Sequence, residues 1–161
     1  MKAIVAYTPA NTAVVPDSAM MRCRDPFFMP DNRQWQALCL FGVRIDRLGK
    51  GISPEFARRY YNECVIAIHP FAVSEPDDTA ERWARDGALV VSESLSADSL
   101  DEELRKEIDA MISRVSRNAT LKTGDLILMV DDDRSFDIKE IPSNHFVEPR
   151  SGLPGMKFKV R

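Results

Sequence analysis

Apolar runs of strand length, separated by short polar breaks, dominate the hydrophobic pattern of this 161-residue chain. The runs predict strands at residues 2–7, 35–45, 65–68, 88–91, 126–130, 136–141 and 156–160. Residues 35–45 are almost continuously apolar, which is typical of a strand buried on both faces. Residues 156–160 alternate between apolar and polar side chains, which indicates a single buried face.

Three segments are predicted to be helices, and the two longer ones place apolar side chains at three- and four-residue spacing. The longest is expected to be capped by Ser99, with Glu102 completing a capping box. Its buried stripe comprises Leu100, Leu104, Ile108, Met111, Ile112 and Val115. Another is expected to open at Ser53 and to bury Phe56, Ala57, Tyr60, Tyr61 and Cys64. A short third helix is predicted at residues 79–85.

The remaining segments contain the residues that favour turns. They predict loops at 8–15, 75–78 and 142–155, turns at 16–18 and 122–125, and a short edge segment at 27–29. Strands outnumber helices and the order of the two is mixed, so the predicted fold class is α+β and β-rich. The length predicts a single domain covering residues 1–161.

Composition and charge limit the classes of molecule that this chain is expected to bind. The net charge is −3 and the basic residues are scattered, so we expect no nucleic-acid binding. No uncharged run approaches the length of a membrane span, and the first residues lack the pattern of a signal peptide. Cys23, Cys39 and Cys64 are widely spaced and odd in number, which fits a reducing compartment. We therefore expect a cytoplasmic protein that binds neither nucleic acid nor membrane.

Several segments recur in a recognisable order: PDSAM at 16–20, RIDRLGKGI at 44–52, FARRYY at 56–61, DAMI at 109–112, TLKTGDLI at 120–127 and GMKFKV at 155–160. In this order and spacing they resemble segments of the fumarylacetoacetate hydrolase family, also known as the 2-hydroxyhepta-2,4-diene-1,7-dioate isomerase family. The resemblance covers residues 14–130 and the tail. It implies the family's rolled mixed β-sheet with a few flanking helices, and usually a dimer.

The metal-binding residues of the family are not expected at the corresponding positions of this chain. Its members hold a divalent cation such as Mg²⁺ with an E-x-E pair and a later aspartate, and such hard cations prefer oxygen ligands. The resemblance places Leu38 and Leu40 at the two glutamates and His69 at the aspartate. Leucine offers a cation no lone pair, and residues 18–54 contain no glutamate. We therefore expect neither this metal site nor a metal cofactor.

The other functional positions also differ from the family pattern. Val15 stands at the family's lysine, and residues 129–132 read MVDD in place of the substrate-binding T-G-T-P. The N-terminal loop that supplies a catalytic histidine in many members has no counterpart. The resemblance therefore implies a truncated, degenerate member without catalytic groups. The polar residues left as candidates for a residual pocket are Asp17, Ser18, Asp46, His69, Glu75 and Asp131.

Each candidate also has a simpler structural interpretation. His69 could be a zinc ligand in a rebuilt site with Glu75 or Asp46, but we favour a hydrogen-bonded histidine at a strand end. Residues 131–133 could bind calcium, but they lack the EF-hand spacing, and a solvated acidic turn is favoured. For Cys39 and Cys64 buried packing is favoured over nucleophilic roles, and for His145 a surface loop is favoured over a pocket.

Three hypotheses about function follow. The leading one is a pseudoenzyme or binding protein that pairs with itself or with an active relative. The second is an active hydrolase or isomerase of small keto acids with a site rebuilt around His69. The third is a sensor that binds a small molecule in the old pocket without metal.

Overall fold

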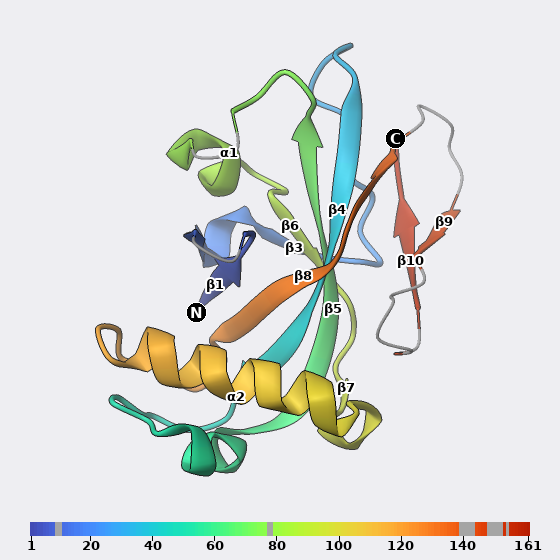
Figure 1. Ribbon diagram of the computed structural model, residues 1–161. Helices are drawn as coiled ribbons and strands as arrows, with labels where there is room; N and C mark the ends of the chain where they lie inside the picture. Colours follow the sequence, from blue (N-terminus) through green and yellow to red (C-terminus); the bar gives the residue numbers. More distant parts are fainter. Residues whose placement is uncertain (9–10, 77–78, 139–143, 148–152, 154) are drawn as a thin grey trace.

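A computed structural model describes the chain except residues 9–10, 77–78, 139–143, 148–152 and 154, and except the side chains of 132–134 and 144–147 (Figure 1). Its main sheet has the strand order β2-β1-β8-β4-β5-β6-β3, with β7 pairing β5. The strands are β1 (Lys2–Ala6), β2 (Thr12–Pro16), β3 (Met20–Arg22), β4 (Trp35–Ile45), β5 (Tyr61–Ala72), β6 (Leu89–Val91), β7 (Leu95–Ser96) and β8 (Leu126–Asp137). Strands β9 (Asn144–Val147) and β10 (Met156–Lys159) form a separate hairpin.

The sheet is mixed, because β1 pairs β8 and β3 pairs β6 in parallel while its other pairs are antiparallel. In Figure 1 the long strands β4, β5 and β8 twist past one another at the centre, and helix α2 (Glu102–Ser116) lies across their lower ends. Helix α1 (Ala80–Ala84) lies on the opposite side of the sheet, where it contacts β2 and Trp83 joins the second hydrophobic cluster. The predicted β-rich α+β class is confirmed, and the sheet is curled.

Strand β4 lies at the centre because it carries apolar side chains on both faces. Its alternate residues from Trp35 to Ile45 join one hydrophobic cluster, which α2 covers through Leu104, Ile108 and Ile112. Leu38 and Leu40 point to a second cluster on the other face. The bounds of this strand match the prediction, and so do β1, β6, β10 and α1 to within two residues.

Several sequence predictions were wrong, and tertiary pairing is the common cause. Residues 53–64 do not form an α-helix: Pro54–Tyr60 is the 3-10 helix η2, and Tyr61 already pairs with Ile45 in β5. The predicted loop at 8–15 contains most of β2, an edge strand that tolerates Pro16 at its end. Part of the predicted loop at 142–155 is β9, because it pairs with β10.

The capping box at Ser99 was also wrong. Ser99 ends the 3-10 helix η3 (Ala97–Ser99), and the α-helix starts two residues later than a Ser99 cap would place it. Its N-cap is Asp101, whose Oδ1 accepts a hydrogen bond of 2.9 Å from the backbone N–H of Leu104. The apolar stripe was predicted correctly, since its members are buried or pack against the core.

The segment at 27–29 is not a strand, but its backbone pairs with the C-terminal end of the chain. Phe27 bridges Val160, with backbone bonds of 2.8 Å between Phe27 N–H and Lys159 O and between Arg161 N–H and Phe27 O. Residues 126–137 form one strand rather than two, and residues 139–141 of the predicted closing strand lie outside the described part. None of the described helices has the length and apolar character that crossing a bilayer requires.

Candidate functional site

The two leucines that the resemblance places at the family's glutamates, Leu38 and Leu40, lie on the sheet face opposite α2. Leu40 is fully buried and Leu38 half-buried, and both contact a cluster that includes Val65, Ala67 and Trp83. Alternation along β4 puts both side chains on the same face. Leu38 pairs with His69 across β4 and β5, so the three positions singled out by the resemblance are neighbours in space.

His69 is completely buried, with 0% of its surface exposed, and both ring nitrogens are used. Nδ1 lies 2.6 Å from the carbonyl oxygen of Ala88, and Nε2 accepts a hydrogen bond of 2.9 Å from Nε of Arg82. An acceptor role for Nε2 puts the proton of the neutral ring on Nδ1. Burial, together with the charges of Arg82 and Arg85, lowers the pKa of His69 to about 3, although the hydrogen bond to Ala88 opposes this shift. His69 is therefore held neutral.

Helix α1 supplies two contacts of His69 that the sequence pattern did not identify. Trp83 stacks on the imidazole at 3.8 Å between ring centroids, and Arg82 is buried with its guanidinium 4.1 Å from the centroid of Phe71. A short helix was predicted here, but nothing in the sequence pattern indicates that an arginine would turn inward. The only sequence signal is the adjacent Arg-Trp pair in a segment otherwise rich in polar residues.

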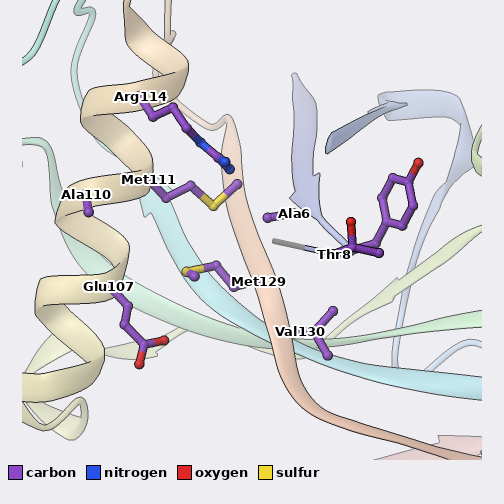
Figure 2. A pocket seen from close by; sticks show the side chains of 9 residues that line it. Ala6, Thr8, Glu107, Ala110, Met111, Arg114, Met129 and Val130 are labelled. Atoms are coloured by element: carbon purple, nitrogen blue, oxygen red, sulfur yellow. The ribbon is translucent and has the colours of Figure 1, made fainter. Parts of the chain in front are cut away.

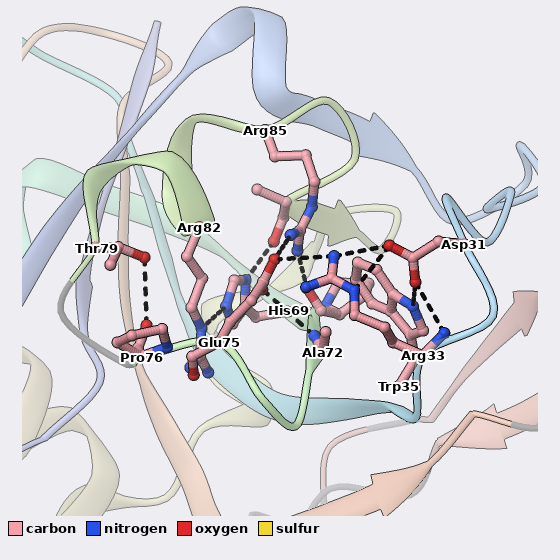
Figure 3. A network of polar contacts seen from close by, with 12 residues as sticks. Asp31, Arg33, Trp35, His69, Ala72, Glu75, Pro76, Thr79, Arg82 and Arg85 are labelled. Carbon is pink, nitrogen blue, oxygen red and sulfur yellow. Dashed lines mark hydrogen bonds and ion pairs between the residues drawn. The ribbon is translucent and has the colours of Figure 1, made fainter.

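Glu75 extends this cluster toward Arg85 and Arg33, as Figure 3 shows. Its carboxylate lies 2.5 Å from a nitrogen of Arg85 and 3.6 Å from one of Arg33. Arg85 also donates to the carbonyl of Pro70 at 2.8 Å. Glu75 is therefore neutralised by arginines rather than directed at the nitrogens of His69.

The donors around His69 do not suit a divalent cation. The neighbouring positions are leucines, Nε2 of His69 faces an arginine, and the nearby carboxylate of Glu75 is paired with arginines. A guanidinium has no lone pair to donate and repels a cation. Among the described residues, no three His, Cys, Asp or Glu side chains gather in a group that could hold a metal ion.

Asp46 lies far from His69. It follows β4 at the end where Ile45 pairs with Tyr61, and β5 runs from Tyr61 to His69 over roughly 26 Å. Its carboxylate accepts a hydrogen bond of 2.5 Å from Asn62 and contacts Arg47 at 3.3 Å. A rebuilt site that contains both Asp46 and His69 is therefore not formed.

The other candidates occupy three further environments. Asp17 and Ser18 are exposed in the 3-10 helix η1 (Asp17–Ala19), and Val15, at the family's lysine position, is buried. Asp131 is 1% exposed within β8, so the prediction of a solvated acidic turn was wrong for this residue. The strand continues there because β4 and β8 stay paired on both sides of a register shift between Leu38 and Leu40.

Cys39 and Cys64 are buried and unoxidised, in agreement with a packing role. Burial raises the pKa of the Cys64 thiol, which makes it less reactive. His145 lies in β9 rather than in a loop, because this strand pairs with β10, and its side chain is outside the described part. The turn at Lys122–Asp125 is present, with Asp125 N–H bonded to Lys122 O at 3.0 Å.

A cavity of about 500 Å³ opens beside α2, where the end of β1 pairs with β8 (Figure 2). Met111 and Arg114 point from the helix toward the strands, and Met129 and Val130 line it from β8. Its other lining residues are Ala6, Tyr7, Thr8, Glu107 and Ala110. None of the six residues proposed from the sequence lines this cavity, although Met129 and Val130 belong to the segment that replaces the family's T-G-T-P.

Comparison with known proteins gives a match at the level of structure. No protein-family profile matches the chain, and no curated sequence matches it. A 5-carboxymethyl-2-hydroxymuconate delta-isomerase from Mycobacterium smegmatis superposes with a TM-score of 0.82 at 16% identity, over 99% of this chain and 76% of that one. A Yersinia pestis protein assigned to the fumarylacetoacetate hydrolase family gives 0.76 at 14%, over 99% and 92%.

A third neighbour was solved with a metal. Maleylpyruvate hydrolase from Sphingobium sp. SYK-6, in complex with manganese(II) and pyruvate, gives a TM-score of 0.80 at 15% identity, over 99% of this chain and 69% of that one. The match is nearly complete for this chain at very low identity. The chain therefore has the fold of the fumarylacetoacetate hydrolase family.

Proposed function

We propose that this chain is a pseudoenzyme that uses the hydrolase-type fold for binding or assembly, without the family's divalent-metal chemistry. One observation carries the proposal: the positions that correspond to the metal ligands hold Leu38 and Leu40 in a hydrophobic cluster, and a His69 with both nitrogens bonded. Carboxylates there would have to be buried without partners, whereas leucines are stabilised by the same surroundings.

The rebuilt-enzyme alternative is less compatible with this geometry. A general base or metal ligand must present a lone pair to its partner. The available lone pair of His69 is taken by Arg82, its surface is covered, and Asp46 lies at the other end of β5.

The test is metal binding by the purified chain. We expect no stoichiometric metal after purification, and a melting temperature that changes by no more than about 1 °C with EDTA, Mg²⁺, Mn²⁺, Ca²⁺ or Zn²⁺. His145→Gln is the matched control for adventitious zinc on the second of the two histidines. One ion per chain and a stabilisation lost in His69→Ala but kept in His145→Gln would overturn the proposal.

The cavity beside α2 supports a second candidate, a sensor that binds a small molecule without metal. Its volume of about 500 Å³ and its lining by Ala6, Met111, Met129 and Val130 suit a mostly apolar ligand. A panel of small aryl and alkyl carboxylates should raise the melting temperature without turnover.

A blocking variant separates ligand binding from nonspecific stabilisation. Ala110 is exposed at the rim of the cavity, so Ala110→Trp should abolish the shift and leave the fold intact. Lys106→Trp adds the same ring at an exposed helix position outside the lining. An equal response in both variants would reject this candidate.

Assembly as a homodimer, or as a heterodimer with an active relative, is part of the same proposal. Sedimentation analysis of the pure chain, and of the chain mixed with such a relative, would detect a mass above the 18.2 kDa of the monomer. A monomer under both conditions would remove assembly from the proposal.

A further inference from the structure

A second cavity lies at the opposite end of the sheet from His69, where β4 leads into η2. It has a volume of about 520 Å³ and is lined by residues on both sides of the Gly49–Ser53 turn, among them Arg47, Lys50, Phe56, Arg59 and Tyr60. None of the three hypotheses about function uses these residues.

The charged side chains that line this cavity are all positive. Three cationic side chains line it and no carboxylate does. Within the described residues, Lys50 and Arg59 form no ion pair, and Arg47 has only the contact with Asp46 at 3.3 Å. The adjacent Arg58 differs, because Glu102 and Asp109 both bind it and it lies outside the lining. Lys50 and Arg59 are therefore uncompensated, and on a chain of net charge −3 they attract anions locally.

Aromatic rings hold two of the three cations in place. The guanidinium of Arg59 lies 4.8 Å from the ring centre of Phe56, and that of Arg47 lies 6.0 Å from the ring centre of Tyr60. Stacking uses the face of a guanidinium, so the in-plane N–H groups of Arg59 remain available to an oxyanion. In Arg47, Nε already donates to Asp46 at 3.3 Å, and the other N–H groups remain available. Phe56 is 46% exposed, more than most large apolar side chains of the chain, so its ring lies at the surface and is not part of the core.

The backbone under these side chains is anchored at several points. Gly51 N–H donates to Ser116 O at 2.8 Å and Ile52 N–H to Ser116 Oγ at 2.9 Å, which ties the turn to the end of α2. Gly49 and Leu121 exchange backbone bonds of 3.0 and 2.9 Å. Gly51 has a φ of +64°, a conformation that glycine adopts without strain. The turn that carries the cations is therefore held in one conformation, so less conformational entropy of the backbone is lost when a ligand binds.

We propose that this cavity binds a small molecule carrying a phosphate or pyrophosphate group. Planar guanidinium groups bind phosphate oxygens through paired N–H donors, and a lysine adds a point charge. The exposed ring of Phe56 would contact an apolar part of the same molecule. Free inorganic phosphate and a phosphorylated metabolite share this chemistry, and the experiment separates them.

The test is calorimetric titration of the full chain with inorganic phosphate, pyrophosphate and a nucleoside diphosphate at constant ionic strength. We expect saturable one-to-one binding, weakened about tenfold or more in Arg59→Gln and in Lys50→Gln, since each variant removes a charge-assisted hydrogen bond. Tighter binding of the nucleoside diphosphate than of pyrophosphate would identify a metabolite site, and equal binding a site for the phosphate group alone.

Arg22→Gln is the matched control, because Arg22 is exposed and lines a different cavity that contains acids as well as arginines. All three substitutions are at exposed positions, so melting temperatures without ligand should be unchanged. The proposal would be overturned if binding were weakened equally in Arg22→Gln, or if none of the three probes gave saturable heat. Binding of an oligonucleotide in place of the three probes would also overturn it.

Discussion

At the scale of single residues, the cluster around His69 shows how a polar side chain can be buried in an apolar region of the sheet. The imidazole is bonded on both sides by Ala88 and Arg82 and covered by Trp83. Each bond satisfies a group that would otherwise be buried without a partner. The ring is thus fixed in one protonation state, and this has a measurable consequence for stability.

Stability should depend on pH through His69. Because its folded pKa of about 3 lies below the ordinary 6.5, the stabilisation is complete above pH 6.5 and is lost as the pH falls from 6.5 toward 3. His69→Gln should cost about 1–3 kcal/mol at pH 7, since bonded groups lose partners, but should reduce the slope of unfolding free energy against pH between 4 and 6. His145→Gln is the control in urea titrations, and the same slope in His69→Gln as in the parent chain would contradict this account.

At the scale of elements, the pairing of β4 with β8 decides the architecture. The two strands are paired from Gln36 to Arg44, with one register shift between Leu38 and Leu40. At Gly42 the two backbones lie so close that a Cβ atom built there would meet the carbonyl oxygen of Ile127 at 1.8 Å. The backbone of β8 cannot yield as a flexible side chain would, so this glycine is needed for space rather than for a turn.

Gly42→Ala should therefore destabilise the chain by more than about 3 kcal/mol, at or beyond the upper end of usual overpacking costs. Gly51→Ala is the matched control, because it makes the same chemical change where nothing lies within 4 Å. Its cost should be about 1 kcal/mol, from the positive φ alone. Equal unfolding free energies of the two variants in urea would show that β4 and β8 can separate to make room.

At the scale of the whole molecule, the core is closed by segments that are distant in the sequence. Phe158 of β10 is fully buried, and its ring lies 5.9 Å from that of Phe27, which in turn contacts Trp35 at 6.1 Å. Backbone bonds from Phe27 to Lys159 and Arg161 support the same junction. The C-terminal strand is thus part of the main core.

Phe158→Ala should reduce the free energy of unfolding by about 3–5 kcal/mol, because it removes a large buried ring and leaves a cavity. Lys157→Ala, on the exposed side of the same strand, should change it by less than about 0.5 kcal/mol. Both variants should be compared by chemical denaturation. Loss of only β10 with the remaining core intact would appear as two transitions and would contradict a single cooperative core.

The sequence by itself determined the elements whose pattern is local. The apolar run of β4, the stripe of α2 and the alternation of β10 each reflect burial of a fixed set of side chains, and the structure keeps all three. The order of short motifs was also sufficient to predict the fold, which the structural neighbours share. The absence of glutamate from residues 18–54 was visible in the sequence, because residue identity alone establishes which side chains carry a carboxylate.

Only the tertiary structure decided where polar side chains meet. Asp46 and His69 were indistinguishable candidates in the sequence, but the β4–β5 register places them at opposite ends of the sheet. The inward turn of Arg82 depends on His69, a residue of another element, so no local pattern could predict it. The uncompensated cations at Lys50 and Arg59 likewise appear only when folding directs the nearby acids elsewhere. The sequence pattern determines which side chains are buried, because burial follows the local alternation of apolar and polar residues. Ion pairs between distant residues depend instead on how the strands pair.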